Sequence, residues 1–296
     1  MLRPLTAPEK RLNTDSILCL NAQGYHRMVY QQWGDANNPN VVVCVHGLAR
    51  NSRDFDDLAR SLQADYRVIC ADVVGRGASD WLPAGVEYGI TQYLQDMVAL
   101  LARLNVAQVD WVGTSMGGLI GMLLAAFPSS PIRRLVLNDI GPFVPQQALQ
   151  RIGSYVGLDP RFDSVQEVET MLRANYPAFS GLSDQQWHHL AQYGSRDAGD
   201  GSLALHYDPA IGHYTRQAAN QDVDLWAMWK QVQCPQLLLW GEQSDVLTRE
   251  TVSAMQQATP SLKLATWPDI GHAPSLMEPE QITTIREWLQ STNESH

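Results

Sequence analysis

Short, unbroken apolar runs recur along the chain, and they constrain its fold more than any other feature. Val41–Val45 reads VVVCV and is stopped by a His-Gly pair. Because such a run shows no alternation of apolar and polar residues, it predicts a strand that is covered on both faces, as in a parallel sheet. Five further runs predict strands of the same kind, over 67–71, 109–112, 135–137, 236–240 and 262–267.

Segments with helical character lie between these runs. Apolar residues in 90–104 recur three or four positions apart, with Thr91 as the expected N-cap, and 117–127 is an apolar stretch that predicts a buried helix. Strands that alternate with helices predict an α/β protein with a doubly wound, mostly parallel sheet. Near the start, 16–20 and 27–33 predict an antiparallel hairpin at the sheet edge.

The alternation breaks between residues 141 and 223. This stretch holds helix-like segments over 165–175 and 183–193, and we find no convincing parallel strand in it. About eighty residues are too many for a single crossover connection. We therefore expect a core formed by 1–140 and 224–296, with 141–223 inserted as a helical cap, or lid, over the sheet.

Composition limits the classes of partner. The 296 residues carry 21 Lys and Arg against 31 Asp and Glu, a net charge of −10, and they contain no run of basic residues. Such a chain is a poor candidate for binding nucleic acid or an anionic membrane surface. A hydrophobic content of 45% is enough for a large core. We expect no nucleic-acid and no membrane partner, and oligomeric state is left open.

The expected compartment is the cytoplasm. Residues 1–10 contain two prolines and no apolar leader, and no stretch reaches the roughly eighteen apolar residues that a membrane helix needs. The four cysteines lie far apart and never form a C-x-x-C pair, and we interpret them as buried thiols. They are Cys19, Cys44, Cys70 and Cys234.

The pentapeptide Gly113–Gly117 reads GTSMG and matches the pattern G-x-S-x-G. An apolar run precedes it and an apolar helical stretch follows it. A sharp strand-to-helix turn in this position, the nucleophile elbow, presents its central hydroxyl at the end of the sheet, and small flanking residues let neighbouring backbone approach. The pattern predicts Ser115 as a nucleophile, with Gly113 and Gly117 shaping the turn.

A serine hydroxyl needs a base, and the base needs an acid that orients it. His272 follows the final predicted strand and is the expected base. Asp245 follows the penultimate strand and is our preferred acid, because the order Ser, Asp, His is the one expected for this arrangement. Asp139, which also ends a predicted strand, is the main competitor, and Glu242 is a weaker third candidate.

Acyl transfer passes through an oxyanion that preplaced N–H groups must stabilise. One expected donor is the backbone N–H of Met116, which follows the nucleophile. The other is the N–H of Leu48, with Ala49 next in line. We expect His46 and Gly47 to shape the loop that carries this second donor.

A second glycine-containing loop follows the neighbouring strand. Residues 72–79 read DVVGRGAS, and the full G-x-G-x-x-G phosphate-binding pattern fails at Asp80. We interpret this loop as structural, supporting the rim of the site. The polar residues Arg50, Asn51 and Arg53 follow the expected oxyanion loop, where they could meet a polar or anionic substrate group, and a solvated helix start accounts for Arg53 equally well.

The segments HGLARN, DVVGRGASD, GTSMGG, WGEQSDVL and DIGHAP, in this order and spacing, resemble the α/β-hydrolase superfamily over most of the chain, from about Val41 to Glu287. The resemblance implies an eight-stranded, mostly parallel sheet with a helical cap inserted after the sixth strand. It also implies a catalytic triad of Ser115, Asp245 and His272. No metal and no organic cofactor is expected.

Departures from subfamily patterns narrow the resemblance. Haloalkane dehalogenases and epoxide hydrolases carry aspartate where Ser115 stands, and hormone-sensitive-type lipases carry a His-Gly-Gly-Gly loop that is absent here. Carbon–carbon bond hydrolases usually carry asparagine where Thr114 stands. What remains resembles esterases, lactonases and thioesterases acting on a small ester-like molecule. The alternatives are a carbon–carbon bond hydrolase, a cofactor-free perhydrolase or a lyase on the same triad, and a non-catalytic ligand-binding receptor.

Overall fold

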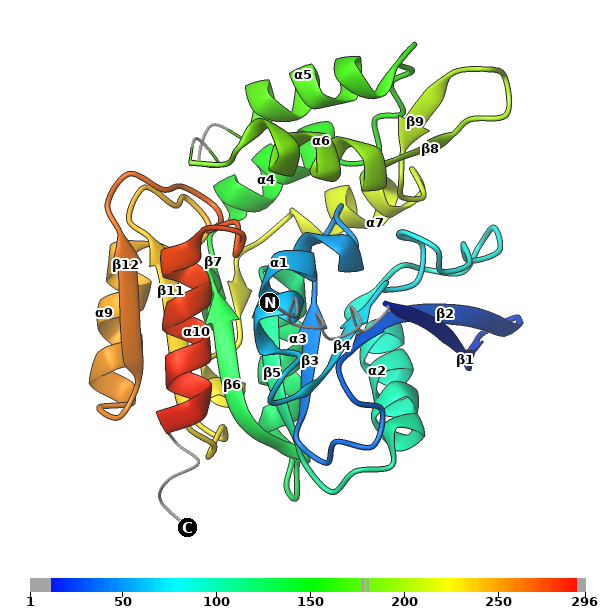
Figure 1. Ribbon diagram of the computed structural model, residues 1–296. Helices are drawn as coiled ribbons and strands as arrows, with labels where there is room; N and C mark the ends of the chain where they lie inside the picture. Colours follow the sequence, from blue (N-terminus) through cyan, green and yellow to red (C-terminus); the bar gives the residue numbers. More distant parts are fainter. Residues whose placement is uncertain (1–11, 177–178, 180, 292–296) are drawn as a thin grey trace, which may run out of the picture.

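A computed structural model describes residues 12–176, 179 and 181–291, and is drawn in Figure 1. Residues 1–10, where no leader is expected, lie outside the described residues. The centre of the fold is an eight-stranded sheet. In spatial order its strands are β1 (Asn13–Asn21), β2 (Gly24–Trp33), β4 (Arg67–Ala71), β3 (Val41–Val45), β5 (Val109–Thr114), β6 (Ile132–Asn138), β11 (Gln236–Gly241) and β12 (Lys263–Trp267).

The sheet confirms the prediction of eight mostly parallel strands. Only the β1–β2 and β2–β4 pairs are antiparallel, so the expected edge hairpin is present, and every other neighbouring pair in the sheet is parallel. All five side chains of β3 are fully buried. The unbroken apolar run that predicted this strand therefore reflects its position near the middle of the sheet, covered on both faces.

Helices cover both faces of the sheet, as the doubly wound prediction requires. Side chains of α1 (Asp56–Leu62) and α10 (Pro279–Ser291) pack on one face. The other face is covered by α2 (Ile90–Leu104), α3 (Met116–Ala126), α8 (Trp226–Trp229) and α9 (Arg249–Ala258). The helix expected in 90–104 is present, but its N-cap is Gly89, so the expectation of Thr91 as N-cap is wrong and Thr91 lies in the first turn.

The segment between β6 and β11 lies over the carboxyl ends of the parallel strands (Figure 1). Its ends are joined where β7 (Phe143–Val144) pairs with β10 (Val223–Asp224). The helices expected over 165–175 and 183–193 are present, the second beginning after its N-cap Ser183. Besides β7 and β10, the segment contains α4 (Gln146–Tyr155), α5 (Val165–Asn175), α6 (Asp184–Tyr193), α7 (Ile211–Ala218), β8 (Ser195–Asp197) and β9 (Leu203–Leu205). Its treatment as a cap separate from the core stays a prediction, and we call residues 141–223 the cap segment.

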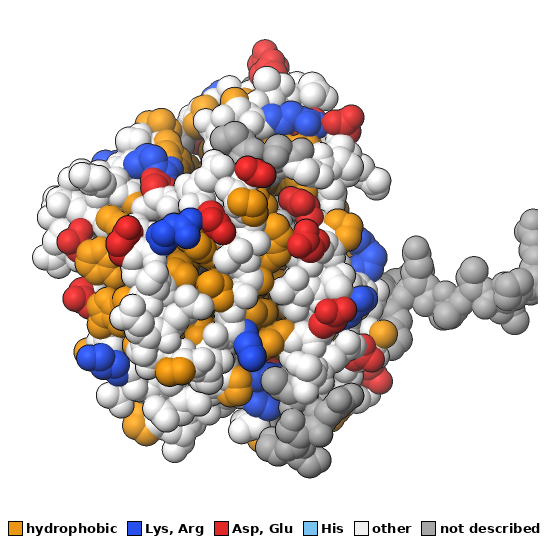
Figure 2. Space-filling view, turned by 90° about the vertical axis from the view of Figure 1, so that its left-hand side faces the viewer, with side chains coloured by type: hydrophobic (Ala, Val, Ile, Leu, Met, Phe, Trp, Pro, Cys, Tyr) orange, Lys and Arg blue, Asp and Glu red, His pale blue; other side chains and the backbone are white. Residues whose placement is uncertain are grey.

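The structure also bears on the expectations of buried thiols, of no membrane partner and of no nucleic-acid partner. Cys19, Cys44 and Cys70 are buried and Cys234 is partly buried, and all four are free thiols. Within residues 12–176, 179 and 181–291, no helix is both long enough and apolar enough to cross a membrane. On the face drawn in Figure 2, basic side chains are scattered among acidic and hydrophobic ones. The absence of a nucleic-acid partner stays a prediction.

Candidate active site

Ser115 lies in the turn between β5 and α3, with a backbone φ of 51° and ψ of −115°. The turn is sharp enough that a Cβ added to Gly113 would lie 2.3 Å from the carbonyl oxygen of Gly117. A Cβ added to Gly117 would lie 2.0 Å from the carbonyl oxygen of Val45. Side chains at these two positions would therefore collide with backbone, which gives the physical reason for glycine on both sides of the elbow.

The hydroxyl of Ser115 heads a chain of hydrogen bonds. Its Oγ lies 2.9 Å from Nε2 of His272, and Nδ1 of His272 lies 2.7 Å from Oδ2 of Asp139. The imidazole is 16% exposed and the carboxylate is fully buried. A proton on Nδ1 donates to the carboxylate and leaves Nε2 free to accept the serine proton, which is the tautomer that a general base needs.

Asp245 does not take part in this chain, and our expectation that it orients His272 is wrong. Its side chain is 50% exposed and forms an ion pair with Arg151 of α4, with Nε–Oδ2 at 2.5 Å and Nη2–Oδ1 at 2.8 Å. The turn that follows β11 carries Asp245 outward to the cap segment. Glu242, the weaker candidate, is likewise paired elsewhere, with Arg249 at 2.8 Å.

Asp139 takes the place of the acid because of where its strand lies. It directly follows β6, which is the immediate neighbour of the β5 strand that leads to Ser115. Its backbone adopts a φ of 55°, and its Oδ1 accepts the N–H of Gly241 at 2.9 Å. The carboxylate is thereby held with Oδ2 directed at the histidine. In the sequence, the feature that could have favoured Asp139 as the acid was its position directly after the strand adjacent to β5.

A further residue of the site, Asn138, was not predicted from the sequence. Its side chain is fully buried, and its Nδ2 donates to Oγ1 of Thr114 at 3.0 Å and to the carbonyl oxygen of Pro274 at 2.9 Å. Thr114 directly precedes Ser115, and Pro274 lies two residues beyond His272. One amide therefore ties the elbow to the loop that carries the base, at the end of the strand that precedes Asp139.

The loop after β3 lies beside the nucleophile. A Cβ added to Gly47 would lie 3.8 Å from Cβ of Ser115, so a side chain at this position would reach the nucleophile. The loop forms a turn in which the N–H of Arg50 donates to the carbonyl oxygen of Gly47 at 3.2 Å. That Leu48 and Met116 supply the oxyanion donors stays a prediction. Met116 opens α3, where N–H groups have no partner within the helix.

His46 holds this loop in place from inside the protein. Its Nε2 accepts the N–H of Val73 at 3.0 Å, and its Nδ1–H donates to the carbonyl oxygen of Gly47 at 2.7 Å. The side chain is fully buried, and burial lowers the pKa of His46 to about 3. The imidazole is therefore neutral and acts as a hydrogen-bonded link between the loops that follow β3 and β4.

The polar residues after this loop bind the protein itself. Arg50 donates to both carboxylate oxygens of Asp54, at 2.9 and 2.6 Å. Asn51 donates to the carbonyl oxygen of Tyr193 at 2.8 Å, and the guanidinium of Arg53 lies 3.7 Å from the centre of the Tyr193 ring. The contacts of Asn51 and Arg53 attach the loop to the end of α6 in the cap segment. All three side chains thus have partners within the protein.

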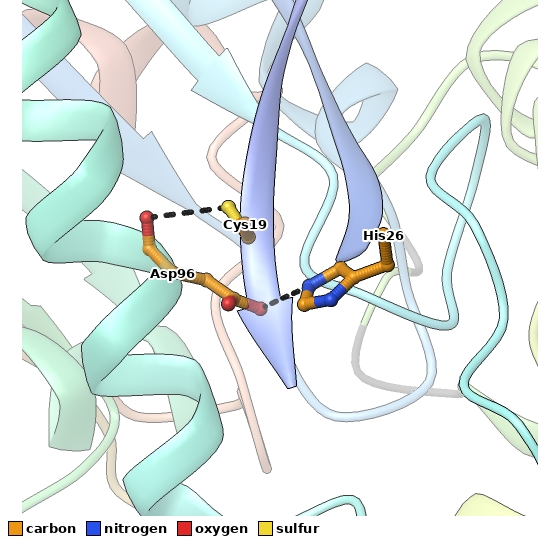
Figure 3. A group of neighbouring side chains, drawn as sticks. All are labelled: Cys19, His26 and Asp96. Atoms are coloured by element: carbon orange, nitrogen blue, oxygen red, sulfur yellow. Dashed lines mark hydrogen bonds and ion pairs between the residues drawn. The ribbon is translucent and has the colours of Figure 1, made fainter. Parts of the chain in front are cut away.

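A second group of polar side chains, Cys19, His26 and Asp96, lies between the edge hairpin and α2, and their ligand atoms fall within 4.8 Å of one another (Figure 3). Its polar atoms already have partners. Nε2 of His26 lies 3.0 Å from Oδ2 of Asp96, and Oδ1 of Asp96 accepts from Gln92 at 2.7 Å. Burial raises the pKa of the Cys19 thiol to about 12, so this side chain is not a ready thiolate ligand. We interpret the group as a hydrogen-bonded network in the core.

Comparisons with known proteins identify the family and the fold. A family model described as the α/β-hydrolase fold matches residues 40–279. A protein of Cupriavidus necator named 3-hydroxybutyrate-oligomer hydrolase is 44% identical over 281 residues, covering 92% of this chain and 96% of its own. The solved structure of an α/β hydrolase from Novosphingobium aromaticivorans is 36% identical with a TM-score of 0.84, covering 94% and 98% of the two chains. A solved structure from Rickettsia typhi is 32% identical with a TM-score of 0.86, covering 95% and 99%.

Proposed function

We propose that this chain, which belongs to the α/β-hydrolase family and is an enzyme of the hydrolase type, cleaves carboxylic esters through an acyl-enzyme on Ser115. The observation that carries the proposal is the chain of two hydrogen bonds, 2.9 Å from Ser115 to His272 and 2.7 Å from His272 to Asp139. Both lie within the range that proton transfer from a serine to a positioned base requires. Ser115, where this series of hydrogen bonds begins, is the residue that the elbow holds at the end of the sheet.

The proposed reaction has two steps. In the first, Ser115 attacks the ester carbonyl as His272 takes its proton through Nε2, and Asp139 stabilises the imidazolium that forms. His272 then gives this proton to the departing alcohol. In the second step the same imidazole activates water, which attacks the acyl group and releases the acid. The backbone N–H groups of Leu48 and Met116 stabilise the oxyanion in both steps.

For the substrate, we propose short linear oligomers of a 3-hydroxy acid such as 3-hydroxybutyrate. The support is the printed name of the Cupriavidus necator relative, which is 44% identical over nearly the whole length of both chains. Each internal linkage of such an oligomer is a carboxylic ester, and its cleavage releases a hydroxyl on one fragment and a carboxylate on the other. The reaction described above balances for this linkage with water as the only co-reactant.

The test is hydrolysis of the 3-hydroxybutyrate dimer and trimer, with p-nitrophenyl butyrate as a general ester. We expect turnover of all three by the wild-type protein and a fall of about 10⁴-fold or more in kcat for Ser115→Ala. Ser253→Ala, which changes an exposed serine of α9, is the matched control and should keep wild-type activity. Turnover of p-nitrophenyl butyrate alone would overturn the substrate class. If the protein hydrolyses none of these esters and they only stabilise its fold as ligands, the proposal that it is an ester hydrolase is overturned.

A further inference from the structure

Arg76 is fully buried in the loop that follows β4, behind the expected oxyanion loop. Its guanidinium donates only to neutral acceptors. Nε donates to the carbonyl oxygen of Leu48 at 2.8 Å, and Nη1 donates to the carbonyl oxygen of Val74 at 2.8 Å and to the Tyr93 hydroxyl at 3.0 Å. Nη2 contacts Sδ of Met116 at 3.6 Å. One side chain thus reaches both residues that are expected to supply the oxyanion donors.

The guanidinium of Arg76 forms no ion pair with any described residue. Among residues 12–176, 179 and 181–291, no carboxylate oxygen lies within 4.0 Å of its guanidinium nitrogens. The face of the Tyr93 ring, 4.9 Å from the guanidinium carbon, and that of Tyr88, 5.7 Å away, supply part of the compensation. Buried arginines are usually paired, because an isolated charge in a protein interior is costly. The unpaired cation at this position therefore requires an explanation.

The contact with Leu48 also fixes the backbone beside the nucleophile. The carbonyl of Leu48 belongs to the central peptide of the Gly47–Arg50 turn, whose N–H is that of Ala49, and this is the peptide of a turn that is most free to rotate. The other accepting group of the turn, the Gly47 carbonyl, is held by His46. With Arg76 on the central carbonyl, the turn has one orientation available and its N–H groups are preorganised before substrate arrives.

We propose that Arg76 is a positioning residue for the oxyanion hole, and that the negative charge developing on the substrate oxygen is the anion its buried guanidinium lacks. This inference rests on the proposed function, because it assigns a role within the same acyl-transfer reaction. The guanidinium holds the Leu48 carbonyl and thereby fixes the turn that contains the Leu48 N–H, and it contacts the Met116 side chain at the start of α3, so the turn and the elbow keep one position relative to each other. Its positive charge favours the transition state over the uncharged ester. Loss of this charge should therefore lower kcat and leave KM nearly unchanged.

The surrounding backbone allows the side chain to be changed without releasing the loop. The N–H of Gly77 donates to the carbonyl oxygen of His206 at 3.0 Å, and the N–H of Asp208 donates to the carbonyl oxygen of Gly75 at 2.8 Å. These backbone bonds join the loop to the cap segment whatever side chain stands at position 76. The variants Arg76→Met, which removes the charge, and Arg76→Lys, which keeps it but loses the planar fork, are therefore suitable tests.

The experiment measures kcat and KM on p-nitrophenyl butyrate, together with inhibition by an alkyl trifluoromethyl ketone, whose serine adduct carries an oxyanion. For Arg76→Met we expect kcat to fall by about 10²-fold to 10³-fold with KM changed less than about threefold, comparable to the loss of an oxyanion donor. The affinity for the ketone should fall by a similar factor. Arg76→Lys should lie between Arg76→Met and the wild type in both measurements.

Arg67→Met is the matched control. Arg67 stands at the opposite end of β4 and also donates to neutral acceptors, to Oε1 of Gln32 at 2.9 Å and to the carbonyl oxygen of Leu104 at 3.3 Å. Its kcat and its ketone affinity should match those of the wild type. If Arg76→Met does not fold, Arg76→Lys carries the test, with an expected fall of about tenfold in both quantities.

Unchanged kcat and ketone affinity in a folded Arg76 variant, or a loss confined to KM, overturns this role for Arg76 and leaves the proposed function intact. A wild-type protein that hydrolyses no ester overturns the proposed function, and the role of Arg76 falls with it. The two failures are told apart by the activity of the wild-type protein in the same assay.

Discussion

The molecule contains two histidine–aspartate pairs with similar local geometry and different surroundings. In one, Nδ1 of His272 lies 2.7 Å from Asp139, and in the other, Nε2 of His26 lies 3.0 Å from Asp96. Both aspartates are fully buried. The pairs differ in what meets the second ring nitrogen. In His272 it faces the hydroxyl of Ser115, whereas in His26 it faces the side-chain amide of Asn21 at 3.1 Å.

The comparison shows that a histidine–aspartate pair does not by itself make a reactive site. His26 is 3% exposed and lies between the edge hairpin and α2 (Figure 3). Its second nitrogen faces the amide of Asn21, and the neighbouring Cys19 thiol, whose pKa burial raises to about 12, is not an activated nucleophile. The side chain of His272 is 16% exposed, and its free nitrogen points at a serine on a strained turn. Access and the third partner separate the pair that we propose to be catalytic from the one that stabilises the fold.

The largest expected effect breaks the first pair. Asp139→Asn should lower kcat on p-nitrophenyl butyrate by about 10⁴-fold, because the amide favours the wrong imidazole tautomer. Asp245→Asn, which changes the half-exposed aspartate paired with Arg151, should leave kcat within about threefold of the wild type. A selective loss of turnover in Asp245→Asn would reassign the acid to Asp245.

Breaking the second pair should affect stability and leave catalysis unchanged. Asp96→Asn removes the carboxylate that accepts from both His26 and Gln92 in the core. We expect the free energy of unfolding to fall by about 3 kcal/mol, as for other buried polar pairs that lose a partner. Urea denaturation measures the loss, and kcat per folded molecule should match the wild type. A fall in kcat without a fall in stability would contradict the distinction between the pairs.

A further histidine, His46, is fully buried and makes folding stability depend on pH. Burial depresses the pKa of His46 to about 3, below its ordinary value of 6.5. Below pH 6.5 the unfolded chain therefore binds a proton at this position that the folded chain does not, and folding stability falls as pH falls. Between pH 7 and pH 5 this group should cost about 2 kcal/mol. The measurement is the pH dependence of urea unfolding, with His46→Gln expected to show a shallower slope, and an equal slope would contradict the account.

The smallest expected effect concerns the ion pair that involves Asp245. Arg151 and Asp245 are 46% and 50% exposed, so solvent screens their attraction although the geometry is bidentate. A double-mutant cycle with Arg151→Met and Asp245→Asn should give a coupling energy of about 0.5 kcal/mol, decreasing with added salt. A coupling of several kcal/mol would show that this contact does more to hold the cap segment on the sheet than an exposed pair can.

Much of the fold could be predicted from the sequence because a strand that is buried on both faces requires an unbroken run of apolar residues. The run Val41–Val45 and the pentapeptide around Ser115 each identified their element, and the position of His272 after the last strand predicted its approach to Ser115. Asp245 was wrongly preferred to Asp139 as the acid because the order of residues along the chain does not determine the direction in which a loop turns. Asp139 and Asp245 both follow strands, and only the three-dimensional path of each turn decides which one reaches the histidine.

The supporting residues could not be predicted for a related reason. Asn138 acts by bridging two loops, and its partners Thr114 and Pro274 lie 24 and 136 positions away along the chain. Arg76 stands in a glycine-containing loop that we expected to be structural, and its burial against Leu48 becomes visible only when the loops after β3 and β4 are placed side by side. Such contacts leave no periodicity and no spacing for sequence analysis to detect.

If the mechanism is correct, the acyl group of the ester passes through Ser115, and mass spectrometry of the protein acid-quenched during turnover of p-nitrophenyl butyrate detects it there. We predict one butyryl group per chain, located on the peptide that contains Ser115 and absent from Ser115→Ala. An unmodified Ser115 during rapid turnover, or a butyryl group on another residue that chases into product at the rate of turnover, would contradict the account.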